Sequence, residues 1–116
     1  MPLPLKFYLP LAISMIAAMI ILFTPASGVP TGFEHSDKII HFALFAALAY
    51  SSRVATISAA RTAVWTVTFA GLSEVLQAIL PLGRSGSVSD ALFDVLGVIA
   101  GLVLAVVVAP ARPAIH

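Results

Sequence analysis

Ionisable and amide side chains recur in this sequence as pairs separated by three or four residues. The pairs are Asp37 with His41, Glu74 with Gln77, and Asp90 with Asp94. Residues at this spacing lie on the same face of a helix, so both members of a pair can point in one direction. Carboxylate and imidazole groups bind cations and transfer protons. Brought together, the pairs would form a site for a cation, for a polar ligand or for acid and base catalysis.

The composition indicates the surroundings in which these pairs are held. The chain has 116 residues, of which 60% are hydrophobic and 9% are charged, whereas a soluble domain has roughly 25% charged residues. The net charge of +1 gives no basic excess, so no nucleic-acid partner is expected. The absence of cysteine excludes disulfides, thiolate metal ligands and a cysteine nucleophile. The sequence therefore predicts a membrane protein that contacts the lipid bilayer.

Four apolar ranges approach the length of about 20 residues that a membrane-spanning helix needs. They cover residues from about 7–23, 38–55, 62–80 and 91–109. The connections between them contain the turn and capping residues expected between helices. We therefore predict an all-α fold, an integral membrane four-helix bundle with short loops, in a single domain over residues 1–116.

The first range also allows a second interpretation, a signal peptide. Lys6 precedes the apolar run, and Ala26, Ser27 and Gly28 are small residues of the kind found at cleavage sites. The run is longer than the apolar centre of a usual signal peptide, which favours the spanning helix.

Basic residues are distributed unequally between the two sides that four spans would define. Lys6, Arg53, Arg61 and Arg112 fall on the side of the termini and the middle loop, and Lys38 and Arg84 fall on the other side. By the positive-inside rule, this distribution predicts a multi-pass protein of the bacterial cytoplasmic membrane with both termini in the cytoplasm.

Acidic residues show the opposite distribution, because all five lie in the two outer loops or within about two helical turns of them. A charge exposed at mid-bilayer costs about 2.5–3.5 kcal/mol on insertion scales, so these side chains are expected to face one another between helices. The predicted polar cluster, a candidate ligand-binding site near the outer surface, comprises Asp37, Lys38, His41, Glu74, Gln77, Arg84, Asp90 and Asp94.

Small residues indicate which helix faces pack together. Gly97 and Gly101 continue the stripe of the two aspartates along the last range and form a GxxxG pattern. Their missing side chains let another helix approach closely, which is a main source of helix association in lipid. On the third range, Gly71, Glu74 and Ala78 predict a comparable small and polar packing face.

Simpler roles stay open for several of these residues. Gln77 would join two helices by a hydrogen bond, and Asp90 would interact with the positive end of its helix dipole. Arg84 would lie among lipid headgroups, or hold a phosphate or carboxylate. Glu74 lies well inside a helix, so it indicates a functional site or a buried ion pair.

Two stretches carry a resemblance to a known family. They read DKIIHFALFAALAY and SEVLQAILPLGRSGSVSDALFDVLGVIAGLV. In their order of Asp-Lys-x-x-His-Phe, Glu-x-x-Gln, Gly-Arg and Ser-Asp before a glycine-bearing helix, they resemble the VanZ-like family of small bacterial membrane proteins. The resemblance extends from about Asp37 to Val103. It implies that the family's polar positions here are Asp37, Lys38, His41, Glu74, Gln77, Arg84 and Asp90.

Two residues depart from the family pattern. Asp94 stands where many members have asparagine, which adds a charge, and Phe45 stands where tyrosine is common, which removes a hydroxyl. The founding member of the family is associated with low-level resistance to the glycopeptide antibiotic teicoplanin. The resemblance therefore implies a role at the cell envelope with a link to antibiotic resistance.

Three classes of function stay open on the sequence. The first is recognition of an anionic headgroup or an envelope precursor, with Lys38 and Arg84 meeting the anionic group. The second is a membrane-embedded metal-dependent hydrolase or transferase, although the chain has no HExxH motif or nucleophile elbow, and no metal site or cofactor is predicted. The third is a structural bundle that binds a membrane partner or a second copy of the chain.

Overall fold

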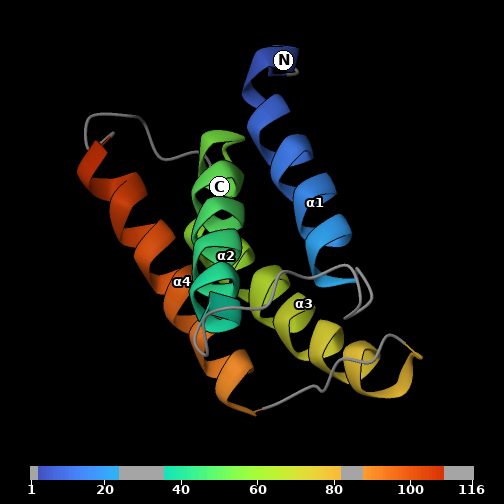
Figure 1. The fold of residues 1–116 in the computed structure, drawn as a ribbon. Helices are drawn as coiled ribbons and strands as arrows, with labels where there is room; N and C mark the ends of the chain where they lie inside the picture. Colours follow the sequence, from blue (N-terminus) through green and yellow to red (C-terminus); the bar gives the residue numbers. More distant parts are fainter. Residues whose placement is uncertain (1–2, 24–35, 82–87, 109–116) are drawn as a thin grey trace.

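The computed structural model describes residues 3–23, 36–81 and 88–108. In these ranges the chain forms a short 3-10 turn, Leu5–Phe7, and the helices α1 (Leu9–Leu22), α2 (Ser36–Val54), α3 (Ala59–Ile79) and α4 (Val88–Val108). No strand occurs in the described residues, so the all-α prediction with four helices is confirmed. Figure 1 shows α2 beside α4, with α1 against α2 and α3 against both members of the central pair.

Local sequence explains where two of the helices begin. Pro10 lies in the first turn of α1, where its missing N–H is not needed for helical hydrogen bonds. The 3-10 turn Leu5–Phe7 precedes α1, which begins at Leu9 and is therefore shorter than the predicted span. The hydroxyl of Ser58 accepts a hydrogen bond from the backbone N–H of Arg61 at 3.2 Å. This N-cap starts α3 earlier than the apolar pattern alone indicates.

Two glycines set the distance between α2 and α4, the most extensively packed helix pair in the described part of the chain. A Cβ added at Gly97 would overlap the carbonyl oxygen of Phe42 and lie 3.1 Å from the amide nitrogen of Ala46. A Cβ added at Gly101 would overlap the carbonyl oxygen of Ala46 and lie 2.9 Å from the Cβ of Ala49. Backbone therefore meets backbone along this interface, as in other helix contacts built on small residues.

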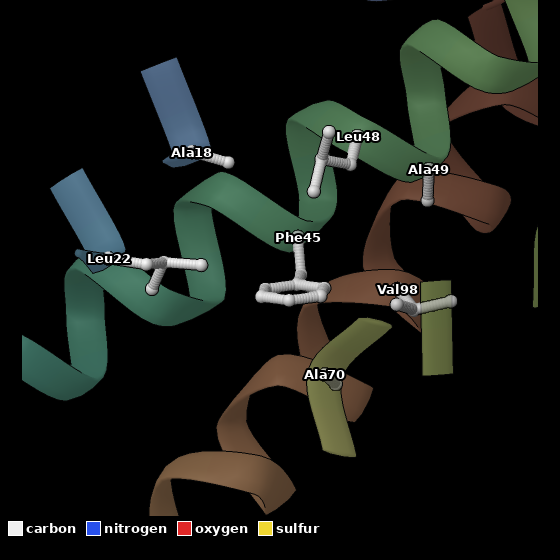
Figure 2. Packing of buried hydrophobic residues seen from close by; sticks show 7 residues of the cluster. All are labelled: Ala18, Leu22, Phe45, Leu48, Ala49, Ala70 and Val98. Carbon is white, nitrogen blue, oxygen red and sulfur yellow. The ribbon is translucent and has the colours of Figure 1, made fainter. Parts of the chain in front are cut away.

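Side chains from all four helices meet in a small apolar core, which Figure 2 shows at close range. Its buried members are Ala18 and Leu22 of α1, Phe45, Leu48 and Ala49 of α2, Ala70 of α3 and Val98 of α4. The ring of Phe45 is fully buried and lies 5.7 Å from the ring of Phe69, centroid to centroid. A tyrosine hydroxyl in this place would need a buried hydrogen-bond partner, so phenylalanine suits the apolar surroundings.

The outer surface of the bundle is also apolar. Each helix exposes large hydrophobic side chains, among them Ile13 on α1, Ile39 on α2, Val64 on α3 and Val103 on α4. By length and composition, α3 and α4 are able to cross a membrane, whereas α1 is apolar but shorter. Helix α2 has the length of a span, but it carries charged residues near both ends. Of the four expected spans, α3 and α4 therefore have both the length and the composition of a membrane-spanning helix.

Polar contacts at the carboxyl end of α2 join it to its neighbours. The hydroxyls of Ser52 and Thr62 lie 2.7 Å apart, and the indole N–H of Trp65 donates to the Ser52 oxygen at 3.0 Å. The hydroxyls of Ser14 on α1 and Ser51 on α2 lie 3.1 Å apart. These neutral hydrogen bonds fix the helices at the end of α2 that lies away from His41.

The glycine contacts predict a sharp difference between substitutions of the same kind. Gly97→Ala and Gly101→Ala should each destabilise the protein by about 1–3 kcal/mol, because the added methyl group pushes α4 away from α2. Gly71→Ala is the matched control, because a Cβ at Gly71 has no atom within 4 Å, and it should be neutral or stabilise the helix by up to about 1 kcal/mol. Unfolding of the purified variants in detergent, followed by circular dichroism, measures the difference. Equal stability of all three variants would contradict the packing described above.

Candidate functional site

The candidate site lies at one end of the bundle, where α2 and α4 begin and α3 ends (Figure 1). Lys38 and His41 lie in the first two turns of α2, and Asp90 and Asp94 lie in the first two turns of α4. Glu74 approaches from the last two turns of α3. Because the described ends of three helices converge here, polar residues that are far apart in the sequence come together.

The closest contact in the site joins His41 to Asp94. The Nδ1 atom of His41 lies 2.7 Å from Oδ1 of Asp94, and both side chains are fully buried. Where Asp94 is ionised, its oxygens only accept hydrogen bonds, and the Nδ1–H of His41 is then the donor. The bond is charge-assisted and joins α2 to α4 inside the bundle.

Glu74 brings a second carboxylate to the same histidine. Its Oε1 atom lies 3.5 Å from Nδ1 of His41, and the residue is 8% exposed. The distance is long for a hydrogen bond but short for attraction between charges in a buried site. His41 of α2 therefore lies between carboxylates of α3 and α4.

Lys38 and Asp90 form a second link between α2 and α4. The ammonium nitrogen of Lys38 lies 3.2 Å from Oδ1 of Asp90. The Lys38 side chain is 30% exposed and the Asp90 side chain 7% exposed, so this pair lies nearer the surface than His41 and Asp94. Since the lysine is partly solvated and has a long stem, it is the cation in the described cluster that an outside ligand can reach most easily.

Gln77 lies on the buried face of α3 but has a different task. It is 1% exposed, and its amide nitrogen donates to the carbonyl oxygen of Leu22 at 2.7 Å. Leu22 is the last residue of α1, where carbonyl groups have no partner within the helix. The bond joins α1 to α3, in agreement with the simpler role of Gln77 that the sequence left open.

The ligand atoms of three residues are close enough to hold one metal ion. One ring nitrogen of His41 and one carboxylate oxygen each of Glu74 and Asp90 lie within 4.8 Å of one another, and all three residues are buried. They come from three different helices, so their proximity depends on the packing of the bundle rather than on local sequence.

The structure does not describe the side chains of two predicted members of the cluster. Arg84 lies outside the described residues, and Asp37 is in the first turn of α2 with a side chain that is not described. In the packing face predicted for α3, Glu74 is buried as expected, but the prediction is wrong for Gly71 and Ala78, which are exposed. The buried face instead comprises Thr62, Thr66, Ala70, Ser73, Glu74 and Gln77. The repeat of small polar residues every three or four positions was the signal for this face.

Comparison with known proteins identifies the family of the chain. A model of the VanZ/LLP1 family matches residues 6–109, which include the predicted polar cluster and all the helices except the first residue of the 3-10 turn. The chain belongs to the VanZ/LLP1 family. No curated protein and no solved structure matches the chain significantly. Membership of VanZ/LLP1 and two helices apolar enough to span a bilayer indicate a membrane protein from a family associated with resistance.

In this VanZ/LLP1 protein, the contact between His41 and Asp94 predicts strong energetic coupling. His41→Ala and Asp94→Ala should each destabilise the fold by about 1–3 kcal/mol, because each leaves a buried polar group without its main partner. The double variant should be less destabilised than the sum of the two, by a coupling energy of about 0.5–3 kcal/mol. Unfolding in detergent of the four proteins of the cycle measures this energy.

The control cycle combines His41→Ala with Ser14→Ala, because Ser14 contacts Ser51 on a different part of α2. These two effects should add within about 0.5 kcal/mol. Additive effects of His41→Ala and Asp94→Ala would mean that the two side chains do not meet in the folded protein.

Proposed function

We propose that this chain is a small multi-pass protein of the bacterial cytoplasmic membrane that recognises a polar headgroup at the outer leaflet, either of a lipid or of a lipid-linked envelope precursor. The observation that carries the proposal is the convergence of Lys38, His41, Glu74, Asp90 and Asp94 at one end of an otherwise apolar bundle. Buried ionisable groups are costly in a membrane protein, and they usually mark a functional site.

The dimensions of the helices support insertion across a bilayer. Helices α3 and α4 have 21 residues each, which corresponds to roughly 31 Å at 1.5 Å per residue, close to the hydrocarbon thickness of about 30 Å. Helix α2 has 19 residues and is only slightly shorter. In the proposed single domain, α1 is the fourth span, and its short length is matched by local thinning of the bilayer or by tilt of its neighbours.

The distribution of charge supports the orientation. Lys6, Arg53 and Arg61 lie near the start of α1, the end of α2 and the start of α3, which are at the opposite end of these helices from the polar cluster. The positive-inside rule assigns that end to the cytoplasm and the polar cluster to the outside. Both termini are then cytoplasmic.

The chemistry of the cluster supports a ligand that carries both an anionic group and hydrogen-bonding groups. Lys38 is partly exposed beside Asp90, so its ammonium can exchange the aspartate for a phosphate or carboxylate without a change in the fold. Arg84 follows α3 in the sequence and provides a guanidinium for the same anion. The carboxylates behind Lys38 accept hydrogen bonds from hydroxyl or amine groups of the ligand.

One observation favours a second function. The grouping of His41, Glu74 and Asp90 within 4.8 Å resembles catalytic metal sites, in which three protein ligands leave one position open for water. A membrane-embedded hydrolase or transferase that acts on the same lipid-linked class of molecules is therefore the alternative. It differs from the first proposal by requiring bond cleavage, which chromatography of the lipid after incubation with the protein would detect.

The proposed orientation predicts which introduced cysteines react from outside. The native chain has no cysteine and gives no background. Cysteine at Ser36 or Ser85 should react with a membrane-impermeant thiol reagent in intact cells, and cysteine at Ser58 or Ala114 should react only after the membrane is opened. The reverse pattern would place the polar cluster on the cytoplasmic side and exclude a ligand at the outer leaflet.

If the cluster recognises this ligand, variants that lose one of its carboxylates should no longer protect a bacterium against teicoplanin. In a bacterium made less sensitive to teicoplanin by expression of this chain, Glu74→Gln and Asp90→Asn should restore most of the sensitivity, because each replaces a carboxylate that accepts hydrogen bonds from the ligand by an amide of similar shape. Ser51→Ala is the matched control, because Ser51 is buried and polar but contacts Ser14. The inhibitory concentration of teicoplanin and the amount of protein in the membrane are measured together. Full protection by well-expressed cluster variants would refute the proposal.

A further inference from the structure

We propose that His41, Glu74 and Asp90 bind one divalent transition-metal cation. This inference goes beyond recognition of a headgroup, because the cation belongs to the protein whether or not a ligand is present. It rests on the positions of the three side chains and on the second carboxylate that contacts the histidine.

The positions of the ligand atoms fit one ion. Zinc–ligand distances of about 2.0–2.2 Å place two ligand atoms of one ion roughly 3–4.4 Å apart. The ligand atoms of His41, Glu74 and Asp90 lie within 4.8 Å of one another. In the proposed site, rotation of the side chains shortens these separations as the ion binds.

The contact between His41 and Asp94 prepares the histidine to act as a ligand. With Asp94 ionised, Nδ1–H donates to it across the 2.7 Å contact, a neutral imidazole carries its lone pair on Nε2, and in the proposed site Nε2 binds the metal. Metal-binding histidines commonly donate their other N–H to a carboxylate, which fixes the ring and increases its basicity. Asp94 is therefore a positioning residue for the proposed site.

The buried carboxylates of the site attract a cation. Glu74, Asp90 and Asp94 lie around His41 and Lys38, and attraction between charges is strong there because water is largely excluded. Asp90 contacts Lys38 through Oδ1, and in the proposed site its other oxygen binds the metal.

The set of ligands selects the class of metal. Imidazole suits Zn²⁺ and other transition metals, and carboxylate oxygens suit Zn²⁺ and Mn²⁺ as well. Mg²⁺ favours an octahedron of oxygen atoms that includes several waters, so a buried site with an imidazole ligand suits it poorly. We therefore choose Zn²⁺ and Mn²⁺ as the probes.

Equilibrium dialysis of the full chain in detergent against each metal, followed by elemental analysis, tests the proposal. One saturable equivalent of Zn²⁺ or Mn²⁺ per chain is expected. Glu74→Gln and Asp90→Asn should each weaken binding at least tenfold, and Asp94→Asn should weaken it by about 10–100-fold, the usual effect of removing a partner of a ligating histidine. Circular dichroism establishes that each variant keeps its helices.

The other two histidines provide the control. Substitution of both His35 and His116 by alanine should leave the dissociation constant unchanged, because neither belongs to the proposed site. X-ray absorption of the Zn²⁺-loaded wild type should show one imidazole among oxygen ligands, and this measurement needs no variant to fold. No saturable binding by the wild type, wild-type affinity in folded Glu74→Gln and Asp90→Asn, or more than one imidazole on the metal would each overturn the proposal. Headgroup recognition would be unaffected by any of these results.

Discussion

The structure depends on the close approach of α2 and α4. In lipid, apolar side chains gain little from meeting one another, so helices associate through tight packing and polar contacts. Gly97 and Gly101 remove the side chains that would hold the helices apart, and the backbone of α4 reaches the carbonyl groups of Phe42 and Ala46. A Cβ at either position would overlap these carbonyl oxygens, so a larger residue would force the two helices apart.

This approach decides which polar groups meet. Gly97 lies one turn beyond Asp94, and Phe42 lies beside His41 in the sequence, so the glycine contact and the contact between His41 and Asp94 belong to adjacent layers of one interface. The pair of Lys38 and Asp90 forms the next layer towards the surface. Packing and electrostatics are therefore coupled, because the charges stabilise the interface only at the distance that the glycines permit.

Burial makes this cluster costly without its partners and suited to binding with them. Replacing one partner of a buried ion pair costs several kcal/mol, whereas an apolar cluster of the same shape is often at least as stable. Stability alone therefore gives little reason for five ionisable groups at one end of a bundle of this size. Binding of a polar molecule or a cation gives such a reason, and it agrees with membership of a family associated with resistance to an antibiotic that acts on the envelope.

The helices and the general position of the cluster could be predicted from apolar ranges and from the distribution of acidic residues along the chain. The partners within the cluster could not. Spacing along one helix pairs His41 with Asp37, whose side chain is not described, and it gives no sign of the contact between His41 and Asp94 of another helix. Helix rotation decides such pairings, and on α3 the small residues Gly71 and Ala78 gave the wrong rotation because they are exposed. The serine and threonine residues on the other side of α3 pack inward instead, since their hydroxyls bond within the bundle.

The most direct test of this account is a measurement of the distance between His41 and Asp94 in the wild-type protein in lipid bilayers. Solid-state NMR on protein labelled with ¹⁵N in histidine and ¹³C in the aspartate carboxyl group gives this distance through dipolar coupling, and His41→Asn assigns the signal. The account predicts a protonated Nδ1 with strong coupling to one carboxyl carbon, as the 2.7 Å contact requires. An Nδ1 signal of His41 without coupling to any aspartate would show that α2 and α4 do not bring these groups together, and the site described here would not exist.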